Sequence, residues 1–354
     1  MKPNRFSYDI AVDISLLLER SAIKVEAFRG KTVLVTGGTG FFGVWMLSSL
    51  IAIKSRLGGD LRIVALSRDP EKFLDEHPTH HFDSQIEFIS GDVKTFRISG
   101  LRVNLLIHMA TTNASETFYG QDQLSKIDML YLGTKNVLEQ CGDSLEKVIF
   151  TSSGVAYGVN KSDFISEGDW TGPDTRDIRS ALAIGKLSAE YLVSYYAEKL
   201  GYEYSIARCF AFAGQYLPMD IHYAFGNFIF NAMQTKDIVI QGDGKDKRSY
   251  LYVGDAVGWL LRLLAHPYND IFNVGSQNAL DMNTLAVKVA LRSNLPIQVK
   301  ILNKPREHGN FSRATYTPCL DKIKTKYDNL YEWTSIEEII DKMLKPLEYP
   351  KCKI

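Results

Sequence analysis

The sequence predicts an α/β fold, with a doubly wound parallel sheet joined to a smaller α/β lobe. Two observations carry this prediction. Short apolar segments with the character of buried strands alternate with longer helical segments over the first two thirds of the chain, as in repeated strand–helix–strand units. After Cys209 the pattern becomes less regular and is interrupted by Gly, Pro and Asn, which indicates a lobe of shorter elements.

The expected elements follow one another along the chain. Strands of the main sheet are expected at 31–36, 62–67, 86–90, 104–109, 147–152 and 204–209, and helices between them at 44–53, 121–141 and 180–199. Short strands of the smaller lobe are expected at 238–240, 250–253 and 271–274. Residues 1–30 are expected to form an amphipathic helical extension that packs outside the first strand through Ile10, Val12, Ile14, Leu17 and Leu18.

Composition excludes several classes of protein. The 354 residues are 45% hydrophobic and 23% charged, and 41 basic side chains balance 41 acidic ones, so neither nucleic acid nor an anionic membrane is expected as a partner. The widely spaced Cys141, Cys209, Cys319 and Cys352 lack the spacing of a metal site and are typical of reduced thiols. Without a long apolar run or a signal-peptide pattern, we expect a cytoplasmic protein that holds no metal.

A glycine-rich turn follows the first expected strand, in the stretch KTVLVTGGTGFFG at 31–43. Gly37, Gly40 and Gly43 have the spacing that permits a tight turn, close approach of the backbone to a pyrophosphate, and contact between helix and strand. Phe41 and Phe42 complete the expected cofactor-binding turn, and the helix that follows would direct its N-terminal N–H groups at the phosphates. The sequence therefore predicts a dinucleotide site of the Rossmann type.

The ends of the next strands bear on the choice of cofactor. The second strand ends in Ser67 and Arg68, and a guanidinium suits the 2′-phosphate of NADP, whereas an acid at that position accepts a hydrogen bond from the ribose of NAD. Asp69 lies one position late, so we expect NADP, with NAD as the alternative. Asp92 and Val93 follow the third strand, where a carboxylate can accept from the adenine amino group. Small residues after the fourth strand leave room for the second half of the cofactor: Ala110, Thr111 and Thr112.

With these features the chain resembles the extended short-chain dehydrogenase/reductase family, specifically its nucleotide-sugar epimerases, dehydratases and 4-keto reductases. The resemblance rests on five stretches: TGGTGFFG at 36–43, GDV at 91–93, TSSGVAYG at 151–158, GKLSAE at 185–190 and GDGKDKRSYLYVGDA at 242–256. It implies an oxidoreductase or epimerase that carries out hydride chemistry at C4 of a sugar attached to a nucleoside diphosphate.

The resemblance also implies a set of catalytic residues, of which this chain lacks one. The family uses a Tyr as acid/base on the sugar C4 oxygen, a Lys four residues later, and a Ser or Thr about 30 residues earlier. Ser153 and Lys186 match the hydroxyl and the lysine, but the tyrosine position is Leu182, which cannot transfer a proton.

Three interpretations of Leu182 remain open. Another group transfers the proton, with Tyr157, Tyr119, Tyr223 and His222 as candidates. Alternatively, the chain binds cofactor and sugar without turnover. In the third interpretation Leu182 is an introduced substitution that inactivates an ordinary enzyme.

Two further positions narrow the expected reaction. Family members that dehydrate the sugar follow the hydroxyl residue with Asp and Glu, and related decarboxylases place a Glu there. Here those positions are Gly154 and Val155, which disfavours both reactions. Reduction of a 4-keto sugar, its reverse, or epimerisation through a transient ketone remains.

The resemblance implies substrate residues in the second part of the chain. Arg248 and Arg306 match arginines that grip the nucleotide pyrophosphate, Asn227 matches an amide that contacts the same phosphates, and Gln241 lies where the base is flanked. The expected domains are thus an extension at 1–30, a Rossmann domain at 31–210, and a mainly nucleotide-sugar-binding lobe at 211–354. Family members pair the helices expected at 121–141 and 180–199 across a two-fold axis, so we expect a homodimer, with apolar surface on Tyr191, Leu192, Tyr195 and Tyr196.

Overall fold

The computed structural model describes residues 8–112, 122–159, 162–219, 223–303, 315–328 and 330–345. At its centre is a seven-stranded sheet with the order β11-β6-β5-β4-β1-β2-β3. Every neighbouring pair in this sheet is parallel, which confirms the predicted fold class. Its strands are β1 (Lys31–Thr36), β2 (Leu61–Ser67), β3 (Glu87–Ser90), β4 (Leu105–His108), β5 (Lys147–Ser153), β6 (Glu203–Cys209) and β11 (Asp270–Val274).

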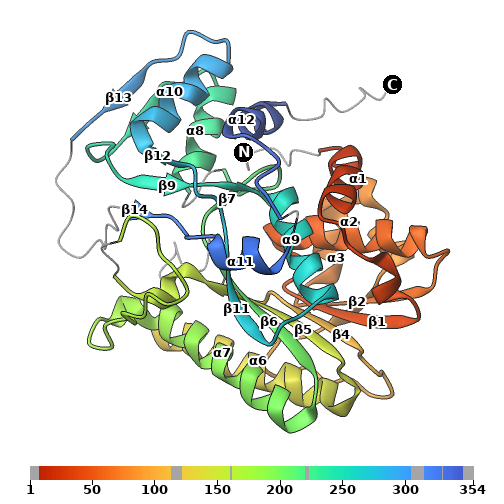
Figure 1. The fold of residues 1–354 in the computed structure, drawn as a ribbon. Helices are drawn as coiled ribbons and strands as arrows, with labels where there is room; N and C mark the ends of the chain where they lie inside the picture. Colours follow the sequence, from red (N-terminus) through yellow and green to blue (C-terminus); the bar gives the residue numbers. More distant parts are fainter. Residues whose placement is uncertain are drawn as a thin grey trace, which may run out of the picture.

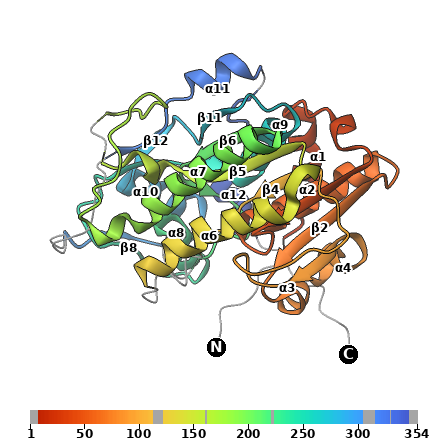
Figure 2. The ribbon, with the colours of Figure 1, turned by 90° about the horizontal axis from the view of Figure 1, so that it is seen from below.

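Helices cover both faces of this sheet, as Figures 1 and 2 show. One face carries α6 (Gln123–Cys141) and α7 (Ala181–Leu200), which pack against each other. The other face carries α2 (Phe41–Arg56) and α9 (Val253–Ala265), with α1 (Ala11–Arg20) packed on both of them. Because both faces are covered, the central strands are continuous apolar runs instead of alternating ones.

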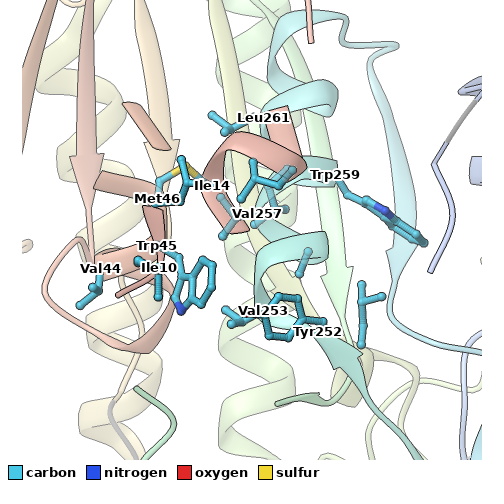
Figure 3. Packing of buried hydrophobic residues seen from close by; sticks show 14 of the residues in the cluster. Ile10, Ile14, Val44, Trp45, Met46, Tyr252, Val253, Val257, Trp259 and Leu261 are labelled. Atoms are coloured by element: carbon cyan, nitrogen blue, oxygen red, sulfur yellow. The ribbon is translucent and has the colours of Figure 1, made fainter. Parts of the chain in front are cut away.

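The N-terminal helix α1 is part of the core. Ile14, Leu17 and Leu18 are buried, and Figure 3 shows Ile14 beside Met46 of α2 and Val257 of α9. A buried side chain of this size contributes roughly 1.5–3 kcal/mol, which holds a ten-residue helix that would be marginal alone. The prediction that Val12 packs with these residues is wrong. Val12 is 70% exposed, because it lies on the solvent side of the helix.

Polar contacts also hold α1 in place. Asp13 accepts hydrogen bonds from the Tyr252 hydroxyl at 2.8 Å and from Lys342 Nζ at 2.6 Å. Tyr252 precedes α9, and Lys342 belongs to the C-terminal helix α12 (Ile336–Leu344). The first and last described helices are therefore joined by an ion pair.

The smaller lobe lies beside the carboxyl ends of the strands (Figure 1). Its helices are α8 (Ala224–Met233), α10 (Met282–Arg292) and α12. Its strands form the pairs β13 (Val299–Ile301) with β8 (Ile238–Ile240) and β10 (Leu251–Tyr252) with β7 (Phe212–Ala213), and the three-stranded sheet β12 (Ala279–Asp281), β9 (Lys247–Ser249) and β14 (Thr315–Tyr316).

One strand lies elsewhere than expected. The segment 271–274, expected in the smaller lobe, is β11 and forms the edge of the central sheet, where Ile271 pairs with Ile206 and Val274 with Cys209. The reason is the crossover through α9, which returns the chain to the main sheet after it has entered the lobe. A parallel crossover of this kind is invisible in the local pattern of the strand itself.

The remaining elements are short connections. They are η1 (Val25–Phe28), α3 (Pro70–Glu76), η2 (Pro78–His80), α4 (Phe82–Gln85), η3 (Gly142–Ser144), η4 (Gly154–Tyr157), η5 (Ile178–Ser180) and α11 (Asp321–Lys326). Among the described residues, no helix has the length and apolar character that crossing a membrane requires.

Candidate active site and dinucleotide site

The glycine turn after β1 has the geometry of a phosphate cradle. Gly37 has a φ of +72°, and a Cβ there would lie 2.6 Å from the Met109 carbonyl carbon at the end of β4. A Cβ on Gly43 would lie 2.0 Å from the Gly38 oxygen, so the helix and the turn touch through bare backbone. A Cβ on Gly40 would make only ordinary contact, since its nearest neighbour would be the Gly37 carbonyl oxygen at 3.7 Å. The residues therefore fit a bound pyrophosphate.

Aromatic side chains support this turn from the helix side. Phe41 and Phe42 open α2 and pack edge to face, with ring centroids 5.4 Å apart. Phe42 also meets Phe212 of β7 at 4.8 Å. The start of the helix is thus held against the first strand of the smaller lobe.

The polar residues after β2 and β3 lie at the same sheet edge as the glycine turn. Ser67 is buried and its hydroxyl accepts from the Asp69 N–H at 3.2 Å, whereas Arg68 is exposed. The Asp69 carboxylate caps α3 by accepting from the Lys72 N–H at 3.0 Å, and Asp92 accepts from the Lys94 N–H at 2.8 Å. Asp69 therefore has a structural role, while Arg68 faces solvent beside the expected adenosine end.

Two more residues expected to contact the cofactor, Val93 and Ala110, are held in position by packing and by a hydrogen bond, respectively. Val93 packs against α6, where a Cβ on Gly133 would lie 2.8 Å from its Cγ1 atom. The Ala110 N–H donates to the Thr36 hydroxyl at 3.3 Å, which ties the end of β4 to the end of β1. Thr111, which is exposed, and Thr112, which is half-buried, continue from this point.

Lys186 lies against the carboxyl-terminal part of β5. It is 3% exposed, and its Nζ donates to the Thr151 carbonyl at 2.6 Å and lies 5.0 Å from the Phe150 ring centroid. The Ser153 hydroxyl, at the end of the same strand, accepts from the Val155 N–H at 3.3 Å. Burial lowers the pKa of Lys186 to about 8, against the opposing effects of Cys209 and Glu190. The ammonium is thus held at the backbone of β5, two residues before Ser153, in a poorly solvated position.

A buried histidine links this region to the glycine turn. His108 lies within hydrogen-bond distance of the Thr36 hydroxyl (2.6 Å from Nδ1) and of the Thr134 hydroxyl (2.8 Å from Nε2). Burial, with a smaller effect from the Lys186 charge, lowers the pKa of His108 to about 3. The imidazole is therefore neutral, and it connects β1, β4 and α6. Its place at the end of a buried strand was the only signal of this role in the sequence.

A buried ion pair between β6 and α7 is hydrogen-bonded to Ser152, near the carboxyl end of β5. Arg208 of β6 donates to Glu190 of α7 at 3.0 Å from Nε and at 2.7 Å from Nη2, and the side chains are 1% and 7% exposed. The Ser152 hydroxyl also donates to Glu190. The guanidinium carbon lies 4.5 Å from the Tyr157 ring centroid and 5.2 Å from that of Trp170. Sequence reasoning missed this network, because no spacing rule links 190 with 208.

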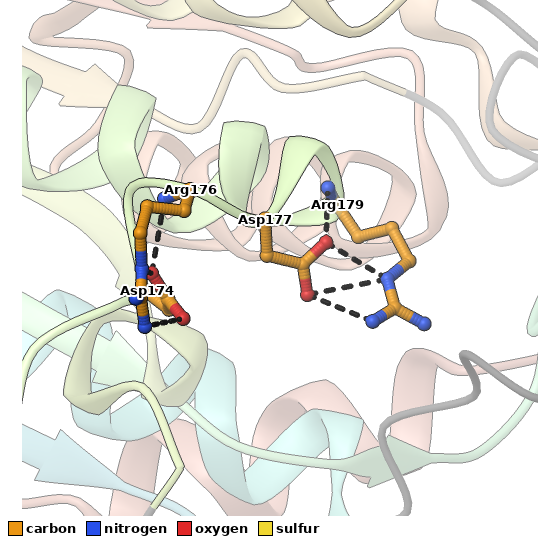
Figure 4. Close-up of polar contacts among 4 residues, drawn as sticks. All are labelled: Asp174, Arg176, Asp177 and Arg179. Atoms are coloured by element: carbon orange, nitrogen blue, oxygen red, sulfur yellow. Dashed lines mark hydrogen bonds and ion pairs between the residues drawn. The ribbon is translucent and has the colours of Figure 1, made fainter.

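The segment that leads into α7 is held by local ion pairs, drawn in Figure 4. Asp174 accepts from Arg176 and Asp177 accepts from Arg179, in both cases from side chain and backbone. Each pair spans two residues, so it fixes only its own turn. The segment therefore presents neutralised charges to solvent just before Leu182.

Comparison with known proteins identifies the family. The profile of the NAD dependent epimerase/dehydratase family matches residues 33–275, which is more than half of the chain. The chain belongs to this family. Its family uses a nicotinamide cofactor, and the glycine turn has the geometry to hold one.

Individual relatives agree with this assignment. UDP-glucuronic acid decarboxylase 2 of Arabidopsis thaliana is 30% identical over 262 residues, which are 73% of this chain and 56% of the relative. The chain thus spans little more than half the length of that protein. UDP-N-acetyl-alpha-D-glucosaminuronate decarboxylase of Bacillus cytotoxicus is 28% identical over 311 residues, 83% of this chain and 91% of the relative.

Solved structures show the same fold. UDP-glucose 4-epimerase of Thermotoga maritima, solved with UDP-glucose, has a TM-score of 0.73 at 20% identity and covers 88% of this chain and 97% of its own. UDP-glucuronic acid 4-epimerase of Bacillus cereus, solved with NAD, has a TM-score of 0.71 at 21% identity, with 88% and 94% covered.

Leu182, which the resemblance matches to the family's tyrosine, is half-buried. Leu182 lies one helical turn before Lys186 on α7, so both side chains leave the helix in nearly the same direction. Of the suggested replacements, Tyr119 and His222 lie outside the described residues. Tyr223 is 44% exposed at the start of α8. Tyr157 is fully buried and its hydroxyl donates to Asn273 Oδ1 at 2.7 Å, so this phenol is held in the core.

The position after Ser153 leaves no room for a carboxyl side chain. A Cβ on Gly154 would lie 2.6 Å from the Tyr316 hydroxyl oxygen and 3.0 Å from Phe210 Cζ. Tyr316 and Phe210 pack with ring centroids 4.7 Å apart. The absence of an acid at 154 therefore has a physical reason, since two aromatic rings fill its space.

The expected substrate residues lie on the smaller lobe. Arg248 belongs to β9, with Leu280 and Tyr316 beside it in the neighbouring strands, and its Nη1 donates to the Lys247 carbonyl at 2.7 Å. Asn227 is in the first turns of α8, and Gln241 follows β8 and is exposed. Arg306 lies outside the described residues.

Proposed function

We propose that the chain is a nucleotide-sugar oxidoreductase or epimerase that carries out hydride chemistry at C4 of the sugar. The observation that most supports this is the hydrogen bond from Lys186 to Thr151, on the strand that ends in Ser153. It holds the ammonium at the backbone of that strand, two residues before the expected catalytic hydroxyl. When bound, the nicotinamide supplies or accepts the hydride.

In this proposal the chain's own groups orient the reactants. The Ser153 hydroxyl hydrogen-bonds to the sugar oxygen, and Lys186 holds the nicotinamide ribose hydroxyls. Arg248, Arg306, Asn227 and Gln241 bind the nucleoside diphosphate. Residues 31–210 carry the cofactor and 211–354 mainly the sugar nucleotide, although α9 and β11 of the second part complete the central sheet. We also propose a cytoplasmic homodimer.

The reaction class follows from Gly154 and Val155. The named relatives include decarboxylases, but here Tyr316 and Phe210 occupy the space beside Gly154, and Val155 carries no charge. This favours reduction of a 4-keto sugar, its reverse, or epimerisation. Leu182 supports one competing proposal, a protein that binds cofactor and nucleotide sugar without turnover.

Turnover distinguishes the two proposals. The purified chain, loaded with NADPH or NADH, is mixed with UDP-, dTDP-, GDP- and CDP-linked 4-keto sugars while nicotinamide absorbance is followed. Oxidation with at least one of them supports the enzyme. Tight binding by calorimetry with no oxidation supports the binding protein. Mass spectrometry of ligands that copurify would identify the base.

The same samples test NADP as the cofactor. A guanidinium at Arg68 suits the 2′-phosphate, so NADPH is expected to bind about tenfold more tightly than NADH. Arg68→Ala should remove that preference. The matched control is Arg62→Ala, which removes another exposed arginine of β2 that pairs with Glu87 at 2.6 Å. NADH bound as tightly as NADPH by the unmodified chain would contradict the assignment.

A further inference from the structure

We propose that Glu332 is a positioning residue for the nucleoside diphosphate, because it holds the loop between β11 and β12 and thereby sets the place of Arg248. This inference rests on the proposed nucleotide-sugar function and concerns the same site. Glu332 lies outside every motif of the sequence and far from Arg248 along the chain. The hydrogen bonds that join the two residues run along one connection of the fold.

That connection is the loop 275–278, which carries the chain from the central sheet into the smaller lobe. β11 ends at Val274, at the edge of the sheet, and β12 begins at Ala279. In the lobe β12 pairs with β9, and Leu280 is opposite Arg248. Figure 1 shows β11 in the sheet and β12 beside β9 in the lobe. The place of Arg248 relative to the sheet therefore depends on this loop.

One carboxylate holds three consecutive residues of the loop. The Ser276 hydroxyl and the Asn278 side-chain amide both donate to Glu332 Oε2, the amide at 2.8 Å. The Gln277 N–H donates to Glu332 Oε1 at 2.8 Å. Hydrogen bonds to an ionised acceptor are roughly twice as strong as those between neutral groups. Because both carboxylate oxygens are used, Glu332 fixes the direction of the loop as well as its distance.

Glu332 is itself held by the core on both sides along the chain. The carbonyl of Tyr331, the residue before it, accepts from the Trp259 indole N–H at 3.1 Å. The backbone N–H of Trp333, the residue after it, donates to the Asp255 carboxylate at 3.0 Å. Trp259 and Asp255 belong to α9 and are 0% and 3% exposed. The carboxylate is therefore anchored to a buried helix, and the loop is anchored to the carboxylate.

The loop also begins next to the proposed reaction site. A Cβ on Gly275 would lie 3.0 Å from Phe210 Cβ and 2.9 Å from Pro318 Cγ, so the backbone passes between these two residues. Phe210 Cζ is in turn 3.0 Å from the point where a Gly154 Cβ would be, and Gly154 follows Ser153. The loop thus spans from the end of β5 to the strand that pairs with β9.

Loss of this anchor is expected to act on one ligand and not on the other. Without the carboxylate, β12 and β9 are held less tightly where the chain enters the lobe, so the bound diphosphate must itself order Arg248. Affinity for the nucleotide then falls by the free energy of that ordering. The glycine turn is built from β1, α2 and the end of β4, so NADPH affinity should be retained.

Removal of the charge tests the proposal. Glu332→Gln keeps the shape of the side chain, and the Kd of UDP, or of dTDP, GDP or CDP where one of these binds instead, should rise about tenfold in calorimetry. The Kd of NADPH should change less than about twofold. The matched control is Glu337→Gln, which removes a carboxylate of α12 that pairs with Lys288 at 2.6 Å and should change neither Kd. An unchanged nucleotide Kd in Glu332→Gln, or an equal loss of both affinities, would overturn the proposal.

A double-mutant cycle distinguishes positioning from general stabilisation. Arg248→Gln should itself weaken nucleotide binding, and Glu332→Gln added to it should raise the Kd less than about twofold further, because the arginine through which Glu332 acts is gone. An equal effect of Glu332→Gln in both backgrounds would assign Glu332 to packing alone. Normal nucleotide binding by Arg248→Gln would also overturn the inference.

A milder variant guards against misfolding. Asn278 is exposed, so Asn278→Ala should fold as the unmodified chain does while it removes one donor to Glu332. It should raise the nucleotide Kd about threefold in the unmodified chain and have little further effect in Glu332→Gln. A neutral Asn278→Ala would contradict the role of this loop. Thermal unfolding of all variants shows whether they are folded.

Binding without turnover separates this inference from the proposed function. Nucleotide binding that is weakened by Glu332→Gln, in a chain that transfers no hydride to any sugar of the panel, contradicts the enzyme and retains Glu332 as a positioning residue. Hydride transfer together with a nucleotide Kd that Glu332→Gln leaves unchanged retains the enzyme and overturns the inference. A chain that binds none of the four nucleotides contradicts both.

Discussion

The two halves of the site differ in what builds them. The dinucleotide half is made of backbone, with a positive φ at Gly37, a helix start at Phe41 and strand ends in register. The proposed sugar-facing half depends on single side chains, and there the sequence predicts a departure from the family at Leu182 and Gly154. Backbone geometry is fixed by the whole fold, whereas one side chain can be exchanged for another that reaches the same place. The comparison teaches that cofactor binding and proton transfer can diverge independently in this fold.

The largest expected effect is on stability, at the buried Arg208–Glu190 pair next to the sugar-facing half. Arg208→Met leaves Glu190 buried without its partner, so the free energy of unfolding should fall by about 3–5 kcal/mol in urea denaturation. The matched control is Arg292→Met, which breaks the partly exposed pair with Asp341 and should cost far less, because solvent screens that pair. Equal losses in the two variants would show that burial of the Arg208 pair does not decide its energy.

The next largest effect tests the backbone half. Gly40 has an ordinary φ of −97°, and a Cβ there would meet nothing closer than the Gly37 oxygen at 3.7 Å, so Gly40→Ala should fold normally while its methyl group enters the phosphate cradle. We expect NADPH affinity to fall about 100-fold by calorimetry, or about 2.7 kcal/mol. Gly242→Ala, at a glycine with no heavy atom within 4 Å, is the control. Unchanged affinity in Gly40→Ala would place the pyrophosphate elsewhere.

Sequence reasoning predicted the backbone half better than the side-chain half for a physical reason. The strand at 31–36 and the strand at 238–240 have the predicted bounds, because periodicity and glycine spacing are local signals. The edge position of β11, the Glu190–Arg208 pair and the contact of Tyr316 with Gly154 depend on residues far apart in the chain. No local pattern encodes those distances, so only the folded structure brings them together.

The local pattern also did not distinguish exposed from buried residues on α7. Tyr191 and Tyr195 are 66% and 47% exposed, and their rings stack with centroids 6.1 Å apart. Leu192 and Tyr196, expected to share that apolar surface, are instead buried, with only 5% and 8% of each residue exposed. They lie on the side of the helix that faces the sheet and α6, and the Tyr196 hydroxyl donates to Glu139 of α6 at 2.7 Å.

A smaller effect is expected from pH at the boundary between the halves. Burial lowers the pKa of Lys186 to about 8, so its ammonium is present below pH 8 and is lost above it. NADPH affinity should therefore decline severalfold as pH rises from 7 to 9, and Lys186→Met should abolish that dependence. Glu190 raises this pKa, so Glu190→Gln should move the decline to lower pH. A decline at the same pH in Lys186→Met would assign it to another group.

The smallest effect on activity is expected from the surface of α6 and α7, which is remote from both halves. Leu124 is 68% exposed and Leu132 44% exposed on α6, which packs against the helix that carries the exposed Tyr191 and Tyr195, and exposed apolar surface of this kind can mark contacts between proteins. We propose that a second copy of the chain covers this apolar surface.

The double variant Tyr191→Glu with Tyr195→Glu should convert a dimer into a monomer in analytical ultracentrifugation, because four carboxylates would meet across the two-fold axis. Since neither tyrosine contacts the glycine turn, Ser153 or Lys186, hydride transfer should change less than about threefold. The control is Tyr268→Glu, an exposed tyrosine that precedes β11. A monomer in the unmodified chain at every concentration would reject the dimer, and a loss of activity that follows dissociation would show that the two halves of the site depend on assembly.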